Sequence, residues 1–105
     1  DKGGWGYAYG AGKAAVSRLS GILSRELGEQ GIQAFTVNPG VITTETLKET
    51  IGEKGVLALS NYSAAPEIPA AVFVWLATDI TAIHYQMRTI NAQSFASKKN
   101  IKAKY

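Results

Sequence analysis

The fold is decided by residues 32–40, Ile32-Gln33-Ala34-Phe35-Thr36-Val37-Asn38-Pro39-Gly40. Branched and aromatic side chains dominate the first six positions, which predicts a short strand over residues 32–37. The Asn-Pro-Gly sequence then predicts a sharp turn, because proline cannot donate a backbone hydrogen bond and glycine accepts unusual backbone angles. A strand that ends in such a turn and follows a helix indicates one arm of a parallel α/β sheet.

A helix is predicted before this strand, from about Tyr9 to Gly28. Its larger apolar residues recur every three or four positions, as they do on one face of a helix: Val16, Leu19, Ile22, Leu23 and Leu27. Glycines at positions 28 and 31 predict where this helix ends.

Further elements are predicted after the turn. Residues 41–63 mix threonine, glutamate and glycine, which favours one or two short helices around 45–60, as in a mobile substrate lid. Residues 67–78 form a clear helix with proline in its first turn, and their apolar composition predicts burial on most sides. A last strand is predicted near residues 88–91. The fold class is therefore α/β, with the order helix, strand, one or two short helices, helix and strand.

Composition excludes several classes of protein. The 105 residues are 46% hydrophobic and 18% charged, which is typical of a globular chain, and no apolar run is long enough to cross a membrane. No leader peptide is expected. The absence of cysteine and the single histidine exclude disulfides, thiolate metal sites and a histidine-rich metal centre, so we expect no metal. A chain without cysteine suits a reducing compartment, and we expect a cytoplasmic protein.

The net charge of +3 comes from the C-terminus. Four lysines lie in the last nine residues, at positions 98, 99, 102 and 104, and the rest of the chain is close to neutral. We therefore expect residues 97–105 to form a basic, flexible tail, and we expect no nucleic-acid partner.

Tyr9 and Lys13 are four residues apart, so a helix places both side chains on one face. A phenol exchanges protons poorly at neutral pH, because its pKa in a model peptide is about 10. A neighbouring ammonium group favours the phenolate and brings that pKa towards the working range. The pair is a candidate for acid/base catalysis, although a solvated helix start would have the same spacing.

The motifs together resemble the C-terminal half of a short-chain dehydrogenase/reductase. The likeness rests on Tyr-x-x-x-Lys followed by two alanines, on the Asn-Pro-Gly-x-Ile-x-Thr motif after a strand, and on a Pro-Glu helix that ends in Leu-Ala-Thr-Asp. It extends from about Tyr9 to Gln93. It implies the C-terminal half of a Rossmann-type, doubly wound parallel sheet, incomplete as a stand-alone domain, with residues 1–96 in a single cofactor-binding domain.

The resemblance also implies roles for individual residues. Tyr9 would be the catalytic acid/base, and Lys13 would lower the tyrosine pKa and bind the nicotinamide ribose. The turn would be shaped by Pro39 and Gly40. The backbone of Ile42 and the hydroxyl of Thr44 would hold the nicotinamide carboxamide. The cofactor would be NAD or NADP, the substrate a small carbonyl or alcohol compound, and the protein a homodimer or homotetramer.

Two parts of the family pattern are missing from this sequence. None of the eight residues before Tyr9 is serine, and the family's catalytic serine would precede the tyrosine. The glycine-rich phosphate loop would belong to an N-terminal half. We therefore expect this chain alone to be inactive. The alternative is a non-catalytic relative, truncated or degenerate, whose helices serve for association.

Overall fold

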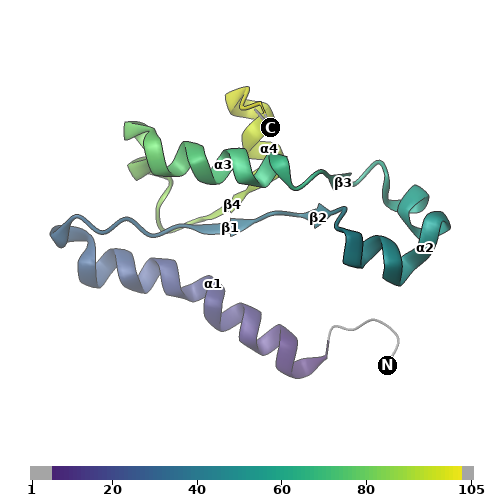
Figure 1. Ribbon diagram of the computed structural model, residues 1–105. Helices are drawn as coiled ribbons and strands as arrows, with labels where there is room; N and C mark the ends of the chain where they lie inside the picture. The colour runs from purple at the N-terminus through teal and green to yellow at the C-terminus, as the bar shows by residue number, and fades with distance from the viewer. Residues whose placement is uncertain (1–5, 103–105) are drawn as a thin grey trace. The chain divides into compact units, whose positions relative to one another are not determined.

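The computed structural model describes residues 6–102 (Figure 1). Four α-helices lie in this range: α1 (Tyr7–Leu27), α2 (Glu45–Leu59), α3 (Glu67–Thr78) and α4 (Ala92–Lys99). Four short strands accompany them: β1 (Thr36–Asn38), β2 (Val41–Ile42), β3 (Ser63–Ala64) and β4 (Thr89–Asn91). Two 3-10 helices, η1 (Gly28–Gln30) and η2 (Ile80–Tyr85), complete the described part. It falls into two compact units, residues 6–36 with 83–90 and residues 37–82 with 91–102.

The first unit is built around α1. This helix ends as predicted, with Gly28 as its C-cap residue and Gly31 in the left-handed region at a φ of 82°. Polar side chains tie α1 to the segment that follows it. The buried Ser20 shares a hydrogen bond with the hydroxyl of Thr36, and that hydroxyl also donates to the carbonyl of Ser17 at 3.1 Å.

The strand after α1 is shorter than the sequence predicted. The prediction covered residues 32–37, whereas β1 begins only at Thr36. Two other hydrogen bonds explain the difference, because the backbone N–H of Ile32 donates to the carbonyl of Leu27 and that of Ala34 donates to the side chain of the distant Gln86. The same Gln86 oxygen accepts from the hydroxyl of Ser24 at 3.2 Å, so it joins two parts of the first unit.

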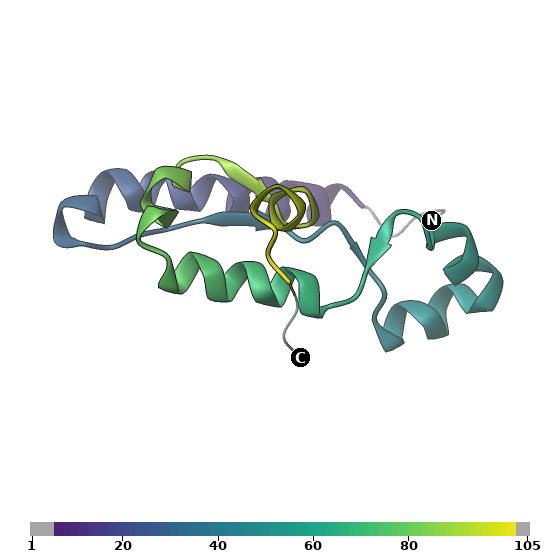
Figure 2. The same ribbon diagram turned by 90° about the horizontal axis from the view of Figure 1, so that it is seen from above.

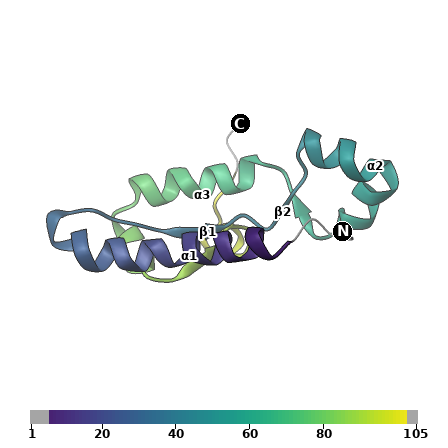
Figure 3. The ribbon, with the colours of Figure 1, turned by 90° about the horizontal axis from the view of Figure 1, so that it is seen from below.

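In the second unit β2 and β3 pair in parallel, with Val41 opposite Ser63 and Ile42 opposite Ala64. The helix α2 connects these two strands, as a parallel pair requires. Figure 3 shows α2 as two helical pieces. They meet at Gly52, whose φ of 68° and ψ of 178° interrupt the helix. The prediction of one or two short helices around residues 45–60 is therefore confirmed. The strands β1 and β4 are neighbours in a separate two-stranded sheet.

The core of the second unit lies between α3 and α4; in Figure 2 α3 runs across the view and α4 is seen nearly end-on. Val72 and Ala92 are fully buried, and the rings of Trp75 and Phe95 meet edge to face, with centroids 5.1 Å apart. The helix α3 has the predicted bounds. It is less covered than predicted, because the side chain of Phe73 is 55% exposed in this chain.

The helix α4 was not predicted from the sequence. Asn91 caps this helix by accepting a hydrogen bond from Ser94, and three buried residues follow helical spacing: Ala92, Phe95 and Ala96. Part of the expected tail is ordered, since α4 continues through Lys99 and the N–H of Ile101 donates to Ala96 at 2.9 Å. Residues 103–105 of that tail lie outside the described range.

The arrangement of helices and parallel strands confirms the predicted α/β class, as a partial Rossmann-type fold. The assignment of residues 1–96 to one domain stays a prediction. Between residues 6 and 102, no helix is long and apolar enough to cross a membrane.

Asp79 gives the second unit a pH-dependent contact. Its carboxylate accepts hydrogen bonds from the hydroxyl and the backbone N–H of Thr81, and these bonds hold the pKa of Asp79 below its ordinary value. A carboxyl whose pKa is lowered in the folded state stabilises the fold above its unfolded pKa, near 4, and loses this contribution as the pH falls through the folded value.

We predict that Asp79→Asn lowers the free energy of unfolding at pH 7 and that its deficit against wild type shrinks below about pH 4. The measurement is urea unfolding of the protein between pH 3 and pH 7. The exposed Glu49 supplies the control, because Glu49→Gln removes the same charge without a Thr81 contact. A deficit that is constant over this pH range would contradict the prediction.

Candidate active site

The structure brings Tyr9 and Lys13 together on α1, in the first unit. The ammonium nitrogen of Lys13 lies 5.6 Å from the centroid of the Tyr9 ring, within the range of a cation–π interaction. The side chain of Tyr9 is 46% exposed, so a substrate can reach the phenol. The phenol of Tyr9 therefore lies beside a cation and remains open to solvent, as a candidate acid/base must.

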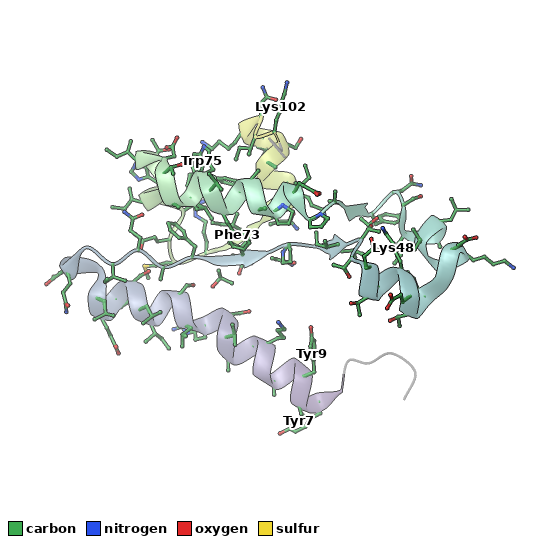
Figure 4. The ribbon with its side chains drawn as sticks, in the orientation of Figure 1. Tyr7, Tyr9, Lys48, Phe73, Trp75 and Lys102 are labelled. Atoms are coloured by element: carbon green, nitrogen blue, oxygen red, sulfur yellow. The ribbon has the colours of Figure 1, made fainter. Side chains whose placement is uncertain are left out.

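Tyr7 is the competitor of Tyr9 on the same helix. Its side chain is 92% exposed and points away from that of Tyr9 (Figure 4). Four residues after Tyr7 the sequence has Ala11, so no cation stands one helical turn beyond Tyr7. The geometry therefore favours Tyr9 over Tyr7 as the acid/base candidate.

The predicted Asn-Pro-Gly turn lies in the second unit, where the chain enters β2. Gly40 has a φ of 75°, which L side chains rarely adopt, and its N–H donates to the side-chain oxygen of Asn38 at 2.9 Å. The turn therefore needs glycine at position 40 for its backbone angle, and asparagine at position 38 satisfies the N–H of that glycine.

A residue that the sequence analysis did not consider also contacts this turn. The side-chain nitrogen of Gln93, on α4, lies 3.1 Å from the carbonyl oxygen of Pro39 and 3.3 Å from that of Val41. A Cβ atom on Gly40 would lie 2.5 Å from the same nitrogen. No local signal predicts this contact, because Gln93 is 54 positions from Pro39.

Ile42 and Thr44 follow the turn directly. The carbonyl of Ile42 accepts from the N–H of Thr44 at 3.0 Å. Thr44 is the N-cap residue of α2, where its hydroxyl oxygen accepts from the N–H of Leu47 at 3.2 Å. This bond uses Thr44 as an acceptor, so its hydroxyl hydrogen can still be donated to a ligand.

The expected lid corresponds to α2. A hollow of about 350 Å³ lies along this helix, lined by Lys48, Gly52, Glu53, Val56, Leu57 and Ser60. The break at Gly52 divides α2 within this hollow, so the two helical pieces form its wall jointly. A wall made of two pieces that join at a glycine can change shape at that joint. The lid role itself stays a prediction.

The predicted site residues thus form two groups, each within one unit. Tyr9 and Lys13 belong to the first unit. The turn residues belong to the second: Pro39, Gly40, Ile42 and Thr44. No cluster of three or more potential metal ligands occurs in the part of the chain that the structure describes.

Comparison with known proteins links both groups to one family. Residues 2–55, just over half of the chain, match the short chain dehydrogenase family. The human "Dehydrogenase/reductase SDR family member 1" is 34% identical over 80 residues, which cover 68% of this chain and 26% of that protein. No solved structure matches the chain.

Two bacterial relatives are similar to the chain to the same degree. The cyclohexanol dehydrogenase of Rhodococcus sp. (strain TK6) is 34% identical over 87 residues, covering 77% of this chain and 32% of the relative. The 3beta-hydroxysteroid dehydrogenase 1 of Eggerthella lenta is 32% identical over 77 residues, which cover 68% of this chain and 30% of that relative. The chain therefore spans about a third or less of the curated relatives that it matches.

We predict that Gly40→Ala lowers the free energy of unfolding of the full-length protein by about 1–3 kcal/mol, the usual cost of a side chain at a positive φ. Gly12→Ala is the matched control. Gly12 lies inside α1 with no atom near its missing Cβ, so the same substitution should raise stability by about 0.5–1 kcal/mol. Urea unfolding measures both variants, and equal stabilities would refute the prediction.

Proposed function

The chain belongs to the short-chain dehydrogenase/reductase family, and we propose that the full-length protein transfers a hydride between NAD or NADP and a carbonyl or alcohol substrate. The observation that carries this proposal is the contact between the Lys13 ammonium and the Tyr9 ring. All six predicted site residues also lie within residues 2–55, the part of the chain that matches the family. Family membership supports an oxidoreductase, and the Tyr9–Lys13 contact supplies a group for its proton transfer.

In this reaction Tyr9 exchanges the proton. When a hydride reaches a carbonyl carbon, the oxygen becomes an alkoxide, and the Tyr9 phenol donates its proton to that oxygen. In the oxidative direction the phenolate takes the proton from the alcohol while the hydride leaves for the cofactor. Lys13 favours the phenolate in both directions and binds the ribose next to the nicotinamide.

The cofactor supplies the hydride chemistry, and the turn in the second unit supplies its orientation. The nicotinamide carboxamide has both a donor and an acceptor, so it needs partners of both kinds. The backbone of Ile42 and the hydroxyl of Thr44 fit this requirement, while Pro39 and Gly40 hold the turn in shape.

The substrate class rests on the family and on the names of relatives. Two of them are named for cyclohexanol and for a hydroxysteroid, both of which have a hydroxyl group. We propose the same functional group, a carbonyl or an alcohol, for the substrate of this protein. The hollow along α2 is mostly apolar in its lining, which suits the carbon skeleton of such a compound.

The apolar side of α1 supports self-association. Val16, Leu19 and Ile22 are exposed in this chain, although their spacing is that of a buried helix face. We propose a homodimer or homotetramer in which such surfaces are covered. The same exposure favours the second candidate function, association without catalysis, which an inactive but oligomeric full-length protein would support. The cytoplasmic location stays a prediction.

We predict that Tyr9→Phe lowers kcat of the full-length enzyme by about 10²–10⁴-fold, the usual contribution of a positioned acid/base. Binding of NADH or NADPH, measured by fluorescence titration, should change little, because the phenylalanine keeps the ring under Lys13. Tyr7→Phe is the control and should keep the wild-type rate. A Tyr9→Phe variant with most of its activity would refute the role of Tyr9.

We also predict that residues 1–105 alone neither bind NAD(P)H tightly nor catalyse turnover. The chain spans only 26–33% of its relatives, and the family's phosphate-binding loop precedes the tyrosine. Isothermal titration calorimetry on the chain and on the full-length protein gives the comparison. Equal affinities in the two titrations would overturn this prediction.

A further inference from the structure

Gln93 connects α4 to the turn that enters β2. A primary amide has two N–H bonds on one nitrogen, and the two carbonyl oxygens nearest to this nitrogen are those of Pro39 and Val41, at 3.1 and 3.3 Å. These carbonyls precede and follow Gly40 in the chain. The Gln93 amide therefore contacts the peptide group before Gly40, the one residue with a positive φ in this turn, and the second peptide group after it, which joins Val41 to Ile42.

The bond to Val41 has a consequence for Ile42. The carbonyl of Val41 and the N–H of Ile42 belong to the same planar peptide group, and all peptide bonds among the described residues are trans. In a trans peptide the C=O and the N–H point in opposite directions. A side chain that holds the Val41 carbonyl therefore also sets the direction in which the Ile42 N–H points.

Gln93 is itself held in place by its helix. It follows the Asn91 cap and the fully buried Ala92, and two residues later Phe95 packs against the Trp75 ring. The Gln93 side chain is half-buried and lies so close to Gly40 that no Cβ atom would fit between them. Its amide thus extends from a packed helix to the turn, and it is not a freely moving surface group.

We infer that Gln93 is a positioning residue for the nicotinamide end of the cofactor, acting through the Pro39–Val41 segment on the Ile42 N–H. This inference rests on the proposed function, in which the backbone of Ile42 binds the carboxamide. It assigns Gln93 no contact with the reacting atoms. Without the amide, the turn keeps its sequence but loses the two bonds that orient the Val41–Ile42 peptide.

The test compares two ligands on the full-length protein. One is the reduced cofactor, and the other is ADP-ribose, or its 2′-phosphate if the enzyme uses NADP, which lacks only the nicotinamide. Gln93→Met keeps the length of the side chain and removes both donors. We expect it to weaken binding of the cofactor about 3- to 10-fold, as the loss of a hydrogen bond typically does, and to change ADP-ribose binding less than twofold.

Gln86→Met is the matched control. The side chain of Gln86 also makes hydrogen bonds between distant segments, but within the first unit, to Ser24 and Ala34. This variant should lose stability in urea unfolding and keep the wild-type ratio of the two dissociation constants. The ratio is the decisive readout, because a partly unfolded sample weakens both ligands equally.

A second variant, Gln93→Glu, keeps the shape of the side chain. At neutral pH its carboxylate faces two carbonyl oxygens and should weaken cofactor binding, whereas a protonated carboxyl can donate to one of them. In Gln93→Glu the affinity for the cofactor, relative to the affinity for ADP-ribose, should therefore recover in part as the pH falls from 8 to 5. This pH dependence should be absent in the wild type and in Gln93→Met.

Several results would overturn the inference. One is an unchanged ratio of the two dissociation constants in both Gln93 variants, and another is an equal loss of affinity for the cofactor and for ADP-ribose. The third is a failure of both Gln93 variants to fold while Gln86→Met folds. Each would mean that Gln93 only stabilises the fold. A wild-type protein that binds neither ligand would instead overturn the proposed function, and the role of Gln93 with it.

Discussion

The positive φ of Gly40 is the constraint on which the second unit depends. It turns the chain out of β1 and into β2, where Val41 and Ile42 pair with β3 in a parallel register. Two residues later Thr44 caps α2, so the start of this helix is tied to the same turn. A side chain at position 40 would disturb both the backbone angle and the contact with Gln93. The pairing of β2, the start of α2 and the turn proposed to bind the cofactor therefore share one local requirement, a glycine at position 40.

The first unit depends on polar side chains more than on apolar packing. Its buried Ser20 and the neighbouring Thr36 hydrogen-bond to each other, while Gln86 accepts from two segments at once. Val16, Leu19 and Ile22 of α1 remain exposed in this chain. Hydrogen bonds from Ser20 and Ser24 tie the helix to the segments that follow it. The Tyr9–Lys13 contact lies near the start of this helix, which begins at Tyr7.

The two units divide the chemistry of the proposed reaction. The first has Tyr9, the proposed proton donor, with the Lys13 ammonium near its ring, and the second has the turn that we propose for the carboxamide. Proton transfer needs a charge next to the phenol, which a helix supplies through spacing alone. Orientation of the planar nicotinamide ring needs fixed peptide groups. A turn supplies them only if a side chain from elsewhere in the chain holds the turn in place. This difference explains why the acid/base pair is visible in five residues of sequence, whereas the support of the turn includes Gln93.

The sequence by itself determined the elements whose signals are local. The three- and four-residue spacing gave α1 and α3, glycines marked the end of α1 and the break in α2, and Asn38-Pro39-Gly40 gave the turn. The cap at Asn91 and the spacing of the buried residues in α4 were equally local, and were overlooked. Only the tertiary structure decided the late start of β1, where Gln86 takes the Ala34 N–H, and the contact of Gln93 with the turn. Both depend on amide side chains more than fifty positions away, and a hydrogen bond between distant residues leaves no periodic pattern in the sequence.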